Sequence, residues 1–303
     1  MLNVTDISFS YGTTKVINNI SFRVKKGENI AIIGESGSGK STLLKLLFGE
    51  FDLDKGSITW NKKQILGPKF NLIPGYDFMK YVSQDLDLMP FTTVEENIGK
   101  FLSSTYPIKK RRRIKELIEL FDLTPYTNIK VKLLSGGQKQ LVSLARALAI
   151  TPKIILLDEP FGHIDTFKKH RLRMRLFNYL KQNKITCILA THDKDDVLGY
   201  ADSMLVLSQG KIEFSDKPEM LYFDPKSPLV ASFFGDFNVI NGELVYAHQL
   251  KAVDRSSLEV FVRQCYFKGT YYLIEANSEN QTIFFNHPNK LKPNHKIYLA
   301  IEK

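Results

Sequence analysis

A glycine-rich loop near the amino terminus carries the residue types that bind nucleotide phosphates. It follows the pattern Gly-x4-Gly-Lys-Ser and lies between an apolar run at Asn29–Ile33 and an apolar helical run at Ser41–Phe48. In this context backbone N–H groups surround phosphate oxygens, and the helix adds the positive end of its dipole. Lys40 reaches the β- and γ-phosphates, and the Ser41 hydroxyl is a magnesium ligand. We therefore predict a site that binds and hydrolyses MgATP. Its expected nucleotide contacts are Gly34, Glu35, Ser36, Gly37, Ser38, Gly39, Lys40, Ser41 and Thr42.

Two acidic residues supply the remaining chemistry of such a site. Asp158 and Glu159 directly follow the apolar run Ile154–Leu157, which has the pattern of a buried strand. Ligands bind at the carboxyl ends of strands in open α/β sheets. We expect Asp158 to hold Mg²⁺ on the side opposite Ser41, through water. Glu159 is then placed to polarise the water that attacks the γ-phosphate.

Further motifs follow in the order of a known family. The run Leu134–Gln138 reads Leu-Ser-Gly-Gly-Gln. With the phosphate loop and the Asp158-Glu159 pair, it resembles the ATP-binding cassette (ABC) family over residues 1 to about 235. A glycine-rich helix start is itself an anion site. In the family this motif closes on the ATP of a second copy, so two chains enclose two nucleotides. The implied contacts in the second copy's site are Ser135, Gly136, Gly137 and Gln138.

The resemblance also assigns roles to four single residues. Tyr11 corresponds to the aromatic residue that stacks on adenine. Gln84 corresponds to the glutamine that senses magnesium and faces the membrane subunit, and Asp165 to the aspartate of the loop that crosses between subunits. His192 corresponds to the histidine that contacts the γ-phosphate. The implied catalytic residues are Glu159, His192, Gln84 and Lys40, and the implied metal ligands are Ser41, Gln84 and Asp158.

Strand-like and helix-like runs alternate through the first two thirds of the chain, which predicts an α/β fold with a largely parallel core sheet. The resemblance specifies a P-loop ABC nucleotide-binding domain at residues 1–235, with a helical insert at about 86–135. Two departures from the family pattern are His163, where a small residue or asparagine is commoner, and a long Pro/Gly-rich segment at 61–80. The strands are expected at residues 2–9, 20–24, 29–33, 57–60, 154–157, 185–190 and 203–207, and the helices at 41–48, 94–103, 109–123, 138–150 and 166–182.

After residue 235 the pattern becomes one of short strands separated by turn residues, which predicts a small all-β domain at 236–303. Two runs, at 262–275 and 293–302, look like the ends of the transport-associated OB domain that follows the cassette in importers of polyamines, ferric iron and sulfate. An OB-type barrel is also an oligonucleotide-binding fold. A dimer-stabilising or regulatory role is the expected one, because basic-aromatic pairs are few in this segment.

The net charge of the chain is compatible with several classes of binding partner. The formal net charge is +10, which favours nucleotides, nucleic acids or anionic membrane surfaces. The densest basic run, Lys109–Lys115, leads into a helical pattern and is either a solvated face or a patch for phospholipid or nucleic acid. No apolar run approaches the ~20 residues of a membrane span, so a membrane role is expected to require a partner.

These features favour a stand-alone ATPase subunit that energises solute import through a membrane permease. The resemblance implies ATP and Mg²⁺ as cofactors and a location on the cytoplasmic face of the cell (inner) membrane. Its expected partners are a second copy of the chain, integral membrane permease subunits and a solute-binding protein, with no direct nucleic-acid partner. Two alternatives remain: a soluble cassette ATPase that acts on nucleic acid or the ribosome, and the ATPase subunit of an efflux transporter.

Overall fold

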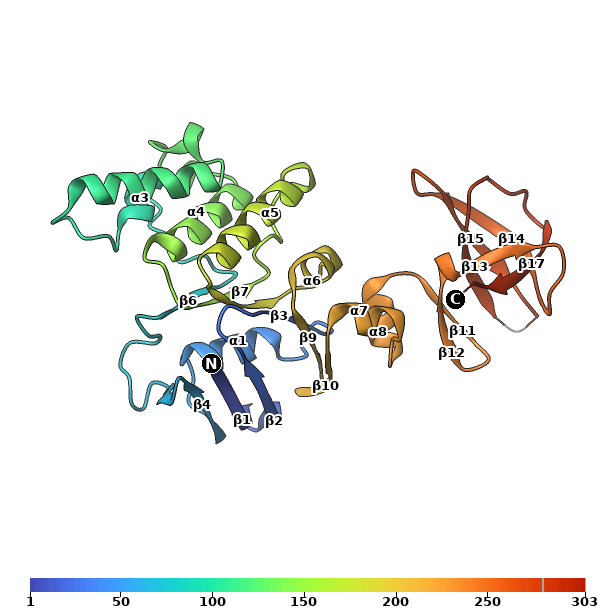
Figure 1. Cartoon of the computed structure of the whole chain (residues 1–303), viewed down its shortest axis with the longest axis horizontal. Helices are drawn as coiled ribbons and strands as arrows, with labels where there is room; N and C mark the ends of the chain where they lie inside the picture. Colours follow the sequence, from blue (N-terminus) through green and yellow to red (C-terminus); the bar gives the residue numbers. More distant parts are fainter. Residues whose placement is uncertain (280, 303) are drawn as a thin grey trace. The chain divides into compact units, whose positions relative to one another are not determined.

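The computed structural model describes residues 1–279 and 281–302. The chain divides into two compact units, Met1–Pro218 and Glu219–Lys303 (Figure 1). This division lies ahead of the domain boundary expected at residue 235, which stays a prediction. Each unit has its own apolar core and is described separately below.

A six-stranded sheet forms the centre of the first unit, in the order β10-β9-β3-β8-β7-β6. Neighbouring strands are parallel, except that β10 pairs antiparallel with β9. Parallel strands with both faces covered read as continuous apolar runs, which explains why β7 and β8 are buried at every position. The strands are β3 (Asn29–Ile33), β6 (Met79–Val82), β7 (Ile154–Asp158), β8 (Thr186–Ala190), β9 (Ser203–Ser208) and β10 (Lys211–Asp216).

A second, antiparallel sheet in the order β2-β1-β4-β5 lies on one side of this core. Helix α1 (Lys40–Phe48) packs between the two sheets, and its leucines share one apolar cluster with Ile154 and Leu156 of β7. Gly49, at φ 79°, ends the helix in the left-handed conformation that glycine adopts without strain. The strands of this sheet are β1 (Leu2–Tyr11), β2 (Thr14–Val24), β4 (Lys55–Trp60) and β5 (Lys63–Gln64).

Helices cover the opposite face of the central sheet (Figure 1). Ile155 and Leu157 point to this side, so alternate residues of β7 face the two apolar clusters. Arg113 ties two helices together, because its guanidinium donates to the carbonyl oxygens of Leu148 and Ala149 at the end of α4. The helices of this unit are α2 (Val94–Gly99), α3 (Pro107–Leu120), α4 (Gly136–Ala149), α5 (Thr166–Gln182) and α6 (Lys194–Tyr200). The expected α/β fold with a helical insert is confirmed.

The second unit is a small β domain preceded by two short helices, α7 (Pro218–Phe223) and α8 (Pro228–Phe234). A hairpin of β11 (Phe237–Ile240) and β12 (Glu243–Tyr246) accompanies an antiparallel sheet in the order β13-β17-β14-β15-β16. The expected small all-β domain is present, whereas its assignment as an OB domain stays a prediction. The sheet strands are β13 (Leu250–Val253), β14 (Leu258–Phe267), β15 (Tyr272–Asn277), β16 (Thr282–His287) and β17 (Lys296–Ile301).

Candidate active site

The phosphate loop connects the carboxyl end of β3 to the first turn of α1. Gly34 has φ 157°, and a Cβ there would lie 2.1 Å from the carbonyl oxygen of Leu207, so this position accepts only glycine. Lys40 Nζ donates to the carbonyl oxygens of Gly34 and Glu35, each at 2.8 Å. These hydrogen bonds connect the end of the loop to its beginning. The buried hydroxyl of Ser38 has no hydrogen-bond partner among the described residues. The loop is therefore shaped to receive an acceptor-rich anion.

An open cleft of about 430 Å³ lies above this loop. Seven of the predicted nucleotide contacts line it, from Gly34 to Thr42, and Gln84, Glu159 and His192 come from three other segments to line the same cleft. Burial lowers the pKa of Lys40, and the charges of Glu159 and Asp158 act in the opposite direction. The structure thus brings the four expected catalytic residues to one cavity, whereas their catalytic roles stay predictions.

Asp158 ends strand β7 and is 3% exposed; it is not among the described residues that line the cleft, although its neighbour Glu159 is. Burial raises the pKa of its carboxyl group, while hydrogen bonds from Ser41 and Tyr81 act in the opposite direction. The Tyr81 hydroxyl lies 3.2 Å from Asp158 Oδ2. Ser41, Gln84 and Asp158 would offer a metal ion three oxygen ligands. This small number of hard ligands fits Mg²⁺, which keeps water molecules and phosphate oxygens in the rest of its coordination shell.

Glu159 has an unusual backbone conformation for a side chain of its type. Its φ is 49°, in the left-handed region, where a residue other than glycine costs of order 1–3 kcal/mol. The strain is held in place by hydrogen bonds from the Glu159 N–H to the carbonyl of Ala190, at 2.9 Å, and from Gly162 N–H to the Glu159 carbonyl, at 3.0 Å. This conformation sends the carboxylate toward His192, whose Nδ1 lies 3.3 Å from Glu159 Oε1. This distance is compatible with a general base and its orienting group, and these roles stay predictions.

The loop that carries His192 is fixed by a buried ionic network. Arg173, 2% exposed on α5, donates from Nε to Asp196 Oδ1 at 2.5 Å and from Nη2 to Asp193 Oδ2 at 2.6 Å. Thr191 Oγ1 donates to Asp196 Oδ2 at 2.6 Å and accepts from the N–H of Asp193. Burial raises the pKa of Asp196, and the hydrogen bonds from Thr191 and Arg173 oppose this shift. Both neighbours of His192 are therefore anchored, which positions its ring at the cleft.

The signature motif lies at the start of α4. Ser135 caps this helix, since its Oγ accepts from the N–H of Gln138 at 3.3 Å and Gln138 Oε1 accepts from the N–H of Ser135 at 2.8 Å. A Cβ at Gly137 would lie 2.6 Å from the carbonyl oxygen of His163, so glycine is required for the close approach. Asp165 begins α5 two residues later in the same loop. Of the described residues that line the phosphate cleft, none comes from this motif.

Tyr11 is placed differently from the catalytic residues. Its ring is 46% exposed and packs edge-on against Phe9 at 4.8 Å and Phe51 at 5.5 Å. Val16, not Tyr11, joins the described lining of the cleft. The exposed ring is available to a base, and its role as an adenine platform stays a prediction.

Gln140 is a site residue that the sequence patterns did not reveal. It lies on α4 and is 2% exposed. Its Nε2 donates to the carbonyl oxygen of Glu159 at 2.8 Å, and its Oε1 accepts from the N–H of His163 at 3.1 Å. The only signal in the sequence is a polar residue within an apolar helical stripe, which is a weak one.

Comparison with known proteins decides the family. A family model described as ABC transporter matches residues 17–162. The chain is also 31% identical, over 298 residues, to the Fe(3+) ions import ATP-binding protein FbpC 2 of Haemophilus influenzae, covering 94% of this chain and 83% of that protein. It belongs to the ATP-binding cassette transporter family. This ABC protein is accordingly an ATP-binding protein and an ATPase, as the motifs predicted.

Other relatives of this ABC protein agree. It is 30% identical to the spermidine/putrescine import ATP-binding protein PotA of Clostridioides difficile, with 96% of this chain and 92% of that protein covered. It is 34% identical to the sulfate/thiosulfate import ATP-binding protein CysA of Halalkalibacterium halodurans, with 82% and 72% covered. Among solved structures, the dimeric cassette MJ0796 bound to ADP and Pi matches with a TM-score of 0.64 and 26% identity, covering 72% of this chain and 98% of that one.

Proposed function

We propose that this chain is the ATP-hydrolysing subunit of a membrane importer. The observation that carries the proposal is the convergence of Lys40, Glu159 and His192 on one cleft above a phosphate loop. The printed functions of the relatives, import of ferric ions, sulfate and polyamines, support import over export. We expect the permease and the solute-binding protein, and not this chain, to determine which solute is imported.

The chemistry at the cleft is phosphoryl transfer to water. Glu159 accepts a proton from the attacking water, and His192 orients the carboxylate and donates to a γ-phosphate oxygen. Lys40 exchanges its two carbonyl partners for β- and γ-phosphate oxygens. A magnesium ion at Ser41, Gln84 and Asp158 would neutralise charge on the phosphates. Electrostatic stabilisation of the transferred group is the main task in such reactions.

The working unit is a pair of identical chains. Ser135 and the exposed start of α4 offer a helix N-terminus to an anion, but they contribute nothing to the described lining of their own chain's cleft. A second copy that places its Ser135 over the γ-phosphate completes the site. The dimeric form of the MJ0796 cassette supports this arrangement.

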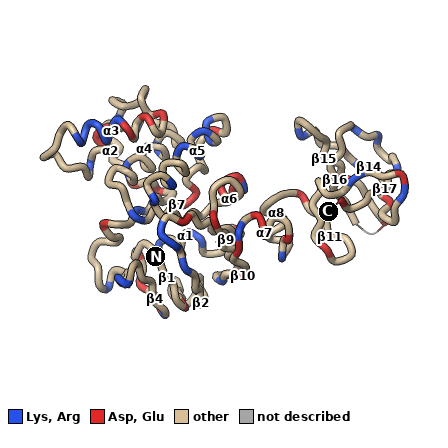
Figure 2. Tube along the Cα trace, in the orientation of Figure 1, with Lys and Arg blue, Asp and Glu red and all other residues tan. Residues whose placement is uncertain are grey.

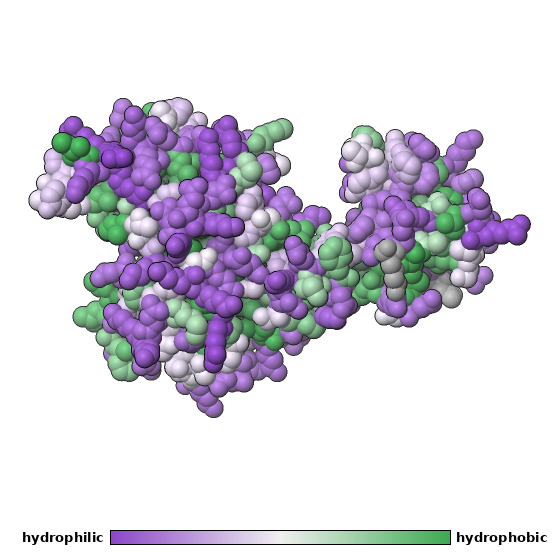
Figure 3. Space-filling view, viewed as in Figure 1, coloured by the Kyte–Doolittle hydropathy of each residue, from purple (hydrophilic) through white to green (hydrophobic). Residues whose placement is uncertain are grey.

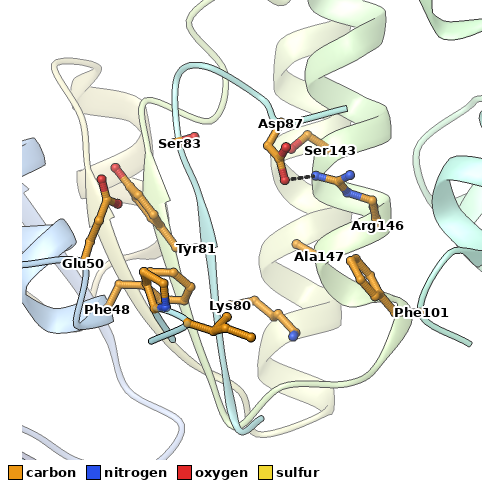
Figure 4. Close-up of a pocket in the computed structure, with 12 residues that line it drawn as sticks. Phe48, Glu50, Lys80, Tyr81, Ser83, Asp87, Phe101, Ser143, Arg146 and Ala147 are labelled. Carbon is orange, nitrogen blue, oxygen red and sulfur yellow. Dashed lines mark hydrogen bonds and ion pairs between the residues drawn. The ribbon is translucent and has the colours of Figure 1, made fainter. Parts of the chain in front are cut away.

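A groove between β6 and the helical insert is the proposed contact with the permease (Figure 4). It has a volume of about 550 Å³, and its lining includes Tyr81, Phe101 and Arg146. Tyr81 also donates a hydrogen bond to Asp158. A partner that displaces Tyr81 in the groove would therefore disturb a predicted magnesium ligand. Arg146 forms an ion pair with Asp87 at 3.3 Å, and its buried Nη1 has no partner among the described residues.

No helix within residues 1–279 or 281–302 is long and apolar enough to cross a membrane. We propose that the chain is held at the cytoplasmic face of the cell membrane by the permease, and that a solute-binding protein delivers the solute on the other side. The β domain at 236–303 is proposed as an OB-type domain that stabilises the dimer or regulates it.

The decisive experiment is affinity purification of the tagged chain from detergent-solubilised membranes. Recovery of a polytopic permease, together with ATPase activity that the permease-bound solute-binding protein stimulates, supports the importer. Recovery of RNA or ribosomes instead, with an ATPase that RNA stimulates in a salt-sensitive way, would replace it with the soluble alternative. An efflux role would appear as solute movement out of energised cells.

A further inference from the structure

The amino-terminal half of α3 has a charge pattern that ATP hydrolysis does not explain. Between Glu96 and Glu116 every charged residue is Lys or Arg, and most of them fall in Lys109–Lys115. Figure 2 shows the basic residues concentrated along this helix. Such a density of like charge stores unfavourable repulsion unless an anionic partner offsets it.

The cations have two distinct environments on the helix. Arg113 turns inward, where it donates a hydrogen bond to the Leu148 carbonyl at the end of α4. It also forms an ion pair with Glu116 at 2.8 Å, so its role is structural. Arg111, Arg112 and Lys115 are exposed, whereas Ile114, Leu117 and Ile118 of the same helix are buried. Lys115 pairs with Glu119 at 3.8 Å, and both side chains are largely exposed, so this ion pair is a surface one. The helix therefore presents an exposed basic face on which Arg111 and Arg112 have no ion pair with a described residue that holds the fold together.

Apolar side chains accompany this basic face. Ile108 is 83% exposed and precedes Arg111, Arg112 and Lys115 at the i, i+3, i+4 and i+7 spacing of one helical stripe. Tyr106 is 60% exposed directly before the helix. Figure 3 shows hydrophobic atoms among hydrophilic ones where this end of α3 lies in Figure 1. An exposed isoleucine beside a row of cations offers an anionic lipid surface both an apolar side chain and positive charge.

We propose that the Tyr106–Lys115 face binds the anionic lipid headgroups of the membrane beside the permease. Arg111, Arg112 and Lys115 contact phosphate groups, and Ile108 enters the boundary between headgroups and acyl chains. The proposal goes beyond the ATPase function, and only its location next to the permease rests on the proposed groove. Phe101, which lines the groove, lies five residues before Tyr106 and is 54% exposed, and the Nζ atoms of Lys100 and Lys80 are 5.2 and 6.0 Å from its ring centre.

A nucleic acid fits the same face less well. Sequence-tolerant binding of single strands relies on aromatic rings that stack on bases. The ring of Tyr106 is already covered by Lys109 Nζ at 5.2 Å. The stripe includes the aliphatic Ile108, 83% exposed, which gains free energy in a lipid interface and none on a phosphate backbone. The observations therefore favour a lipid surface.

The test is co-sedimentation of the purified full chain, without permease, with vesicles of phosphatidylcholine alone or with about 30% phosphatidylglycerol. We expect binding only to the anionic vesicles, and its loss when salt rises from about 0.1 M to about 0.5 M. Arg111→Glu/Arg112→Glu should weaken binding roughly tenfold or more, since each cation near such a surface contributes about 1 kcal/mol. Glutamate suits this helix, so the fold is retained.

The matched control is Arg23→Glu/Lys26→Glu, which makes the same charge change at exposed positions in and just after β2. We expect this control to bind anionic vesicles nearly as the original chain does. Ile108→Ser should weaken binding by a smaller factor that persists in high salt. ATPase activity in solution is measured for every variant and should not change, so a failed ATPase is distinguished from a failed lipid contact. Equal losses in the two charge variants would overturn the proposal, as would tighter binding to single-stranded RNA than to anionic vesicles.

Discussion

Gln140 Nε2 donates a hydrogen bond to the carbonyl oxygen of Glu159 at 2.8 Å. The other end of the same amide accepts from the N–H of His163, so both ends of a buried side chain are used. Gln140 lies one turn beyond Ser135, the first residue of the signature motif. The signature helix is thereby joined by a hydrogen bond to the backbone of the proposed general base, at a residue whose φ lies in the left-handed region.

Gln140→Glu should lower the kcat for ATP hydrolysis by roughly tenfold or more, because a carboxylate cannot donate to the Glu159 carbonyl and repels it. The KM for ATP should change little, since Gln140 does not line the phosphate cleft. Steady-state kinetics separate the two effects. Thermal unfolding serves as the control, and a variant with the original kcat at full stability would show that Gln140 does not position Glu159.

Glu159→Gln should retain ATP binding and lose most turnover, because the amide cannot accept a proton from water. With both sites filled and hydrolysis stopped, the proposed dimer should accumulate. Gel filtration in the presence of MgATP should show a shift to twice the mass, and chelation of magnesium or removal of ATP should reverse it. Normal hydrolysis by this variant would rule out Glu159 as the base.

Lys40→Ala should weaken nucleotide binding, because Lys40 is the cation of the phosphate loop and also closes the loop through Gly34 and Glu35. Titration with a fluorescent ATP analogue measures the affinity, and a loss of roughly tenfold or more is expected from removal of a charge-assisted contact. Adenosine, which lacks phosphates, provides the control ligand and should bind both proteins alike. Unchanged affinity for the ATP analogue would contradict the phosphate-loop assignment.

Sequence patterns predicted the parts of the fold that local physics determines. Continuous apolar runs located β3, β7 and β8, because strands buried on both faces carry no polar alternation. The helix at Thr166–Gln182 was expected with those bounds. Strand β6, Met79–Val82, was missed because it has only four residues and follows a Pro/Gly-rich segment. Its place beside β7 is set by tertiary pairing, not by its own pattern.

Some residues of the candidate site could be predicted from local sequence patterns, and others could not. Glycines and charged residues at fixed spacing predicted roles for Lys40 and Glu159, which the structure places at the same cleft, and the roles themselves stay predictions. Gln140 and Arg173 escaped notice because their roles depend on contacts with segments far along the chain. A buried arginine on α5 reads in the sequence as one more cation of a basic helix, and only its burial distinguishes it.

Arg173→Met should destabilise the first unit by about 3–5 kcal/mol, because it leaves Asp196 buried without its ionic partner. Urea unfolding followed by the fluorescence of Trp60, the single tryptophan, reports on this unit. Arg171→Met is the matched control on the same helix. Arg171 is 56% exposed and pairs with Asp122 at the surface, so its loss should cost less than about 1 kcal/mol. Equal effects of the two substitutions would show that the network around His192 does not depend on Arg173.

Cys187 should be unreactive in the folded chain. Burial in β8 raises the pKa of its thiol, whereas Cys265 is only half-buried, and its Sγ lies 3.4 Å from the carbonyl oxygen of Leu291. At mildly alkaline pH a chromogenic disulfide should titrate Cys265 alone, and Cys187 only after unfolding, because the thiolate is the reactive species. Cys265→Ser should then show no native reactivity.

The same raised pKa has a consequence for stability. Since the folded state resists ionisation of Cys187 and the unfolded state does not, its contribution to stability is fully present below the ordinary thiol pKa of about 8.5 and falls as pH rises above it. Cys187→Ala should therefore flatten the decline of unfolding free energy between about pH 8 and about pH 10, at the cost of a small cavity. Urea unfolding at several pH values measures the slope, and parallel slopes for the two proteins would show that Cys187 does not set the alkaline limit.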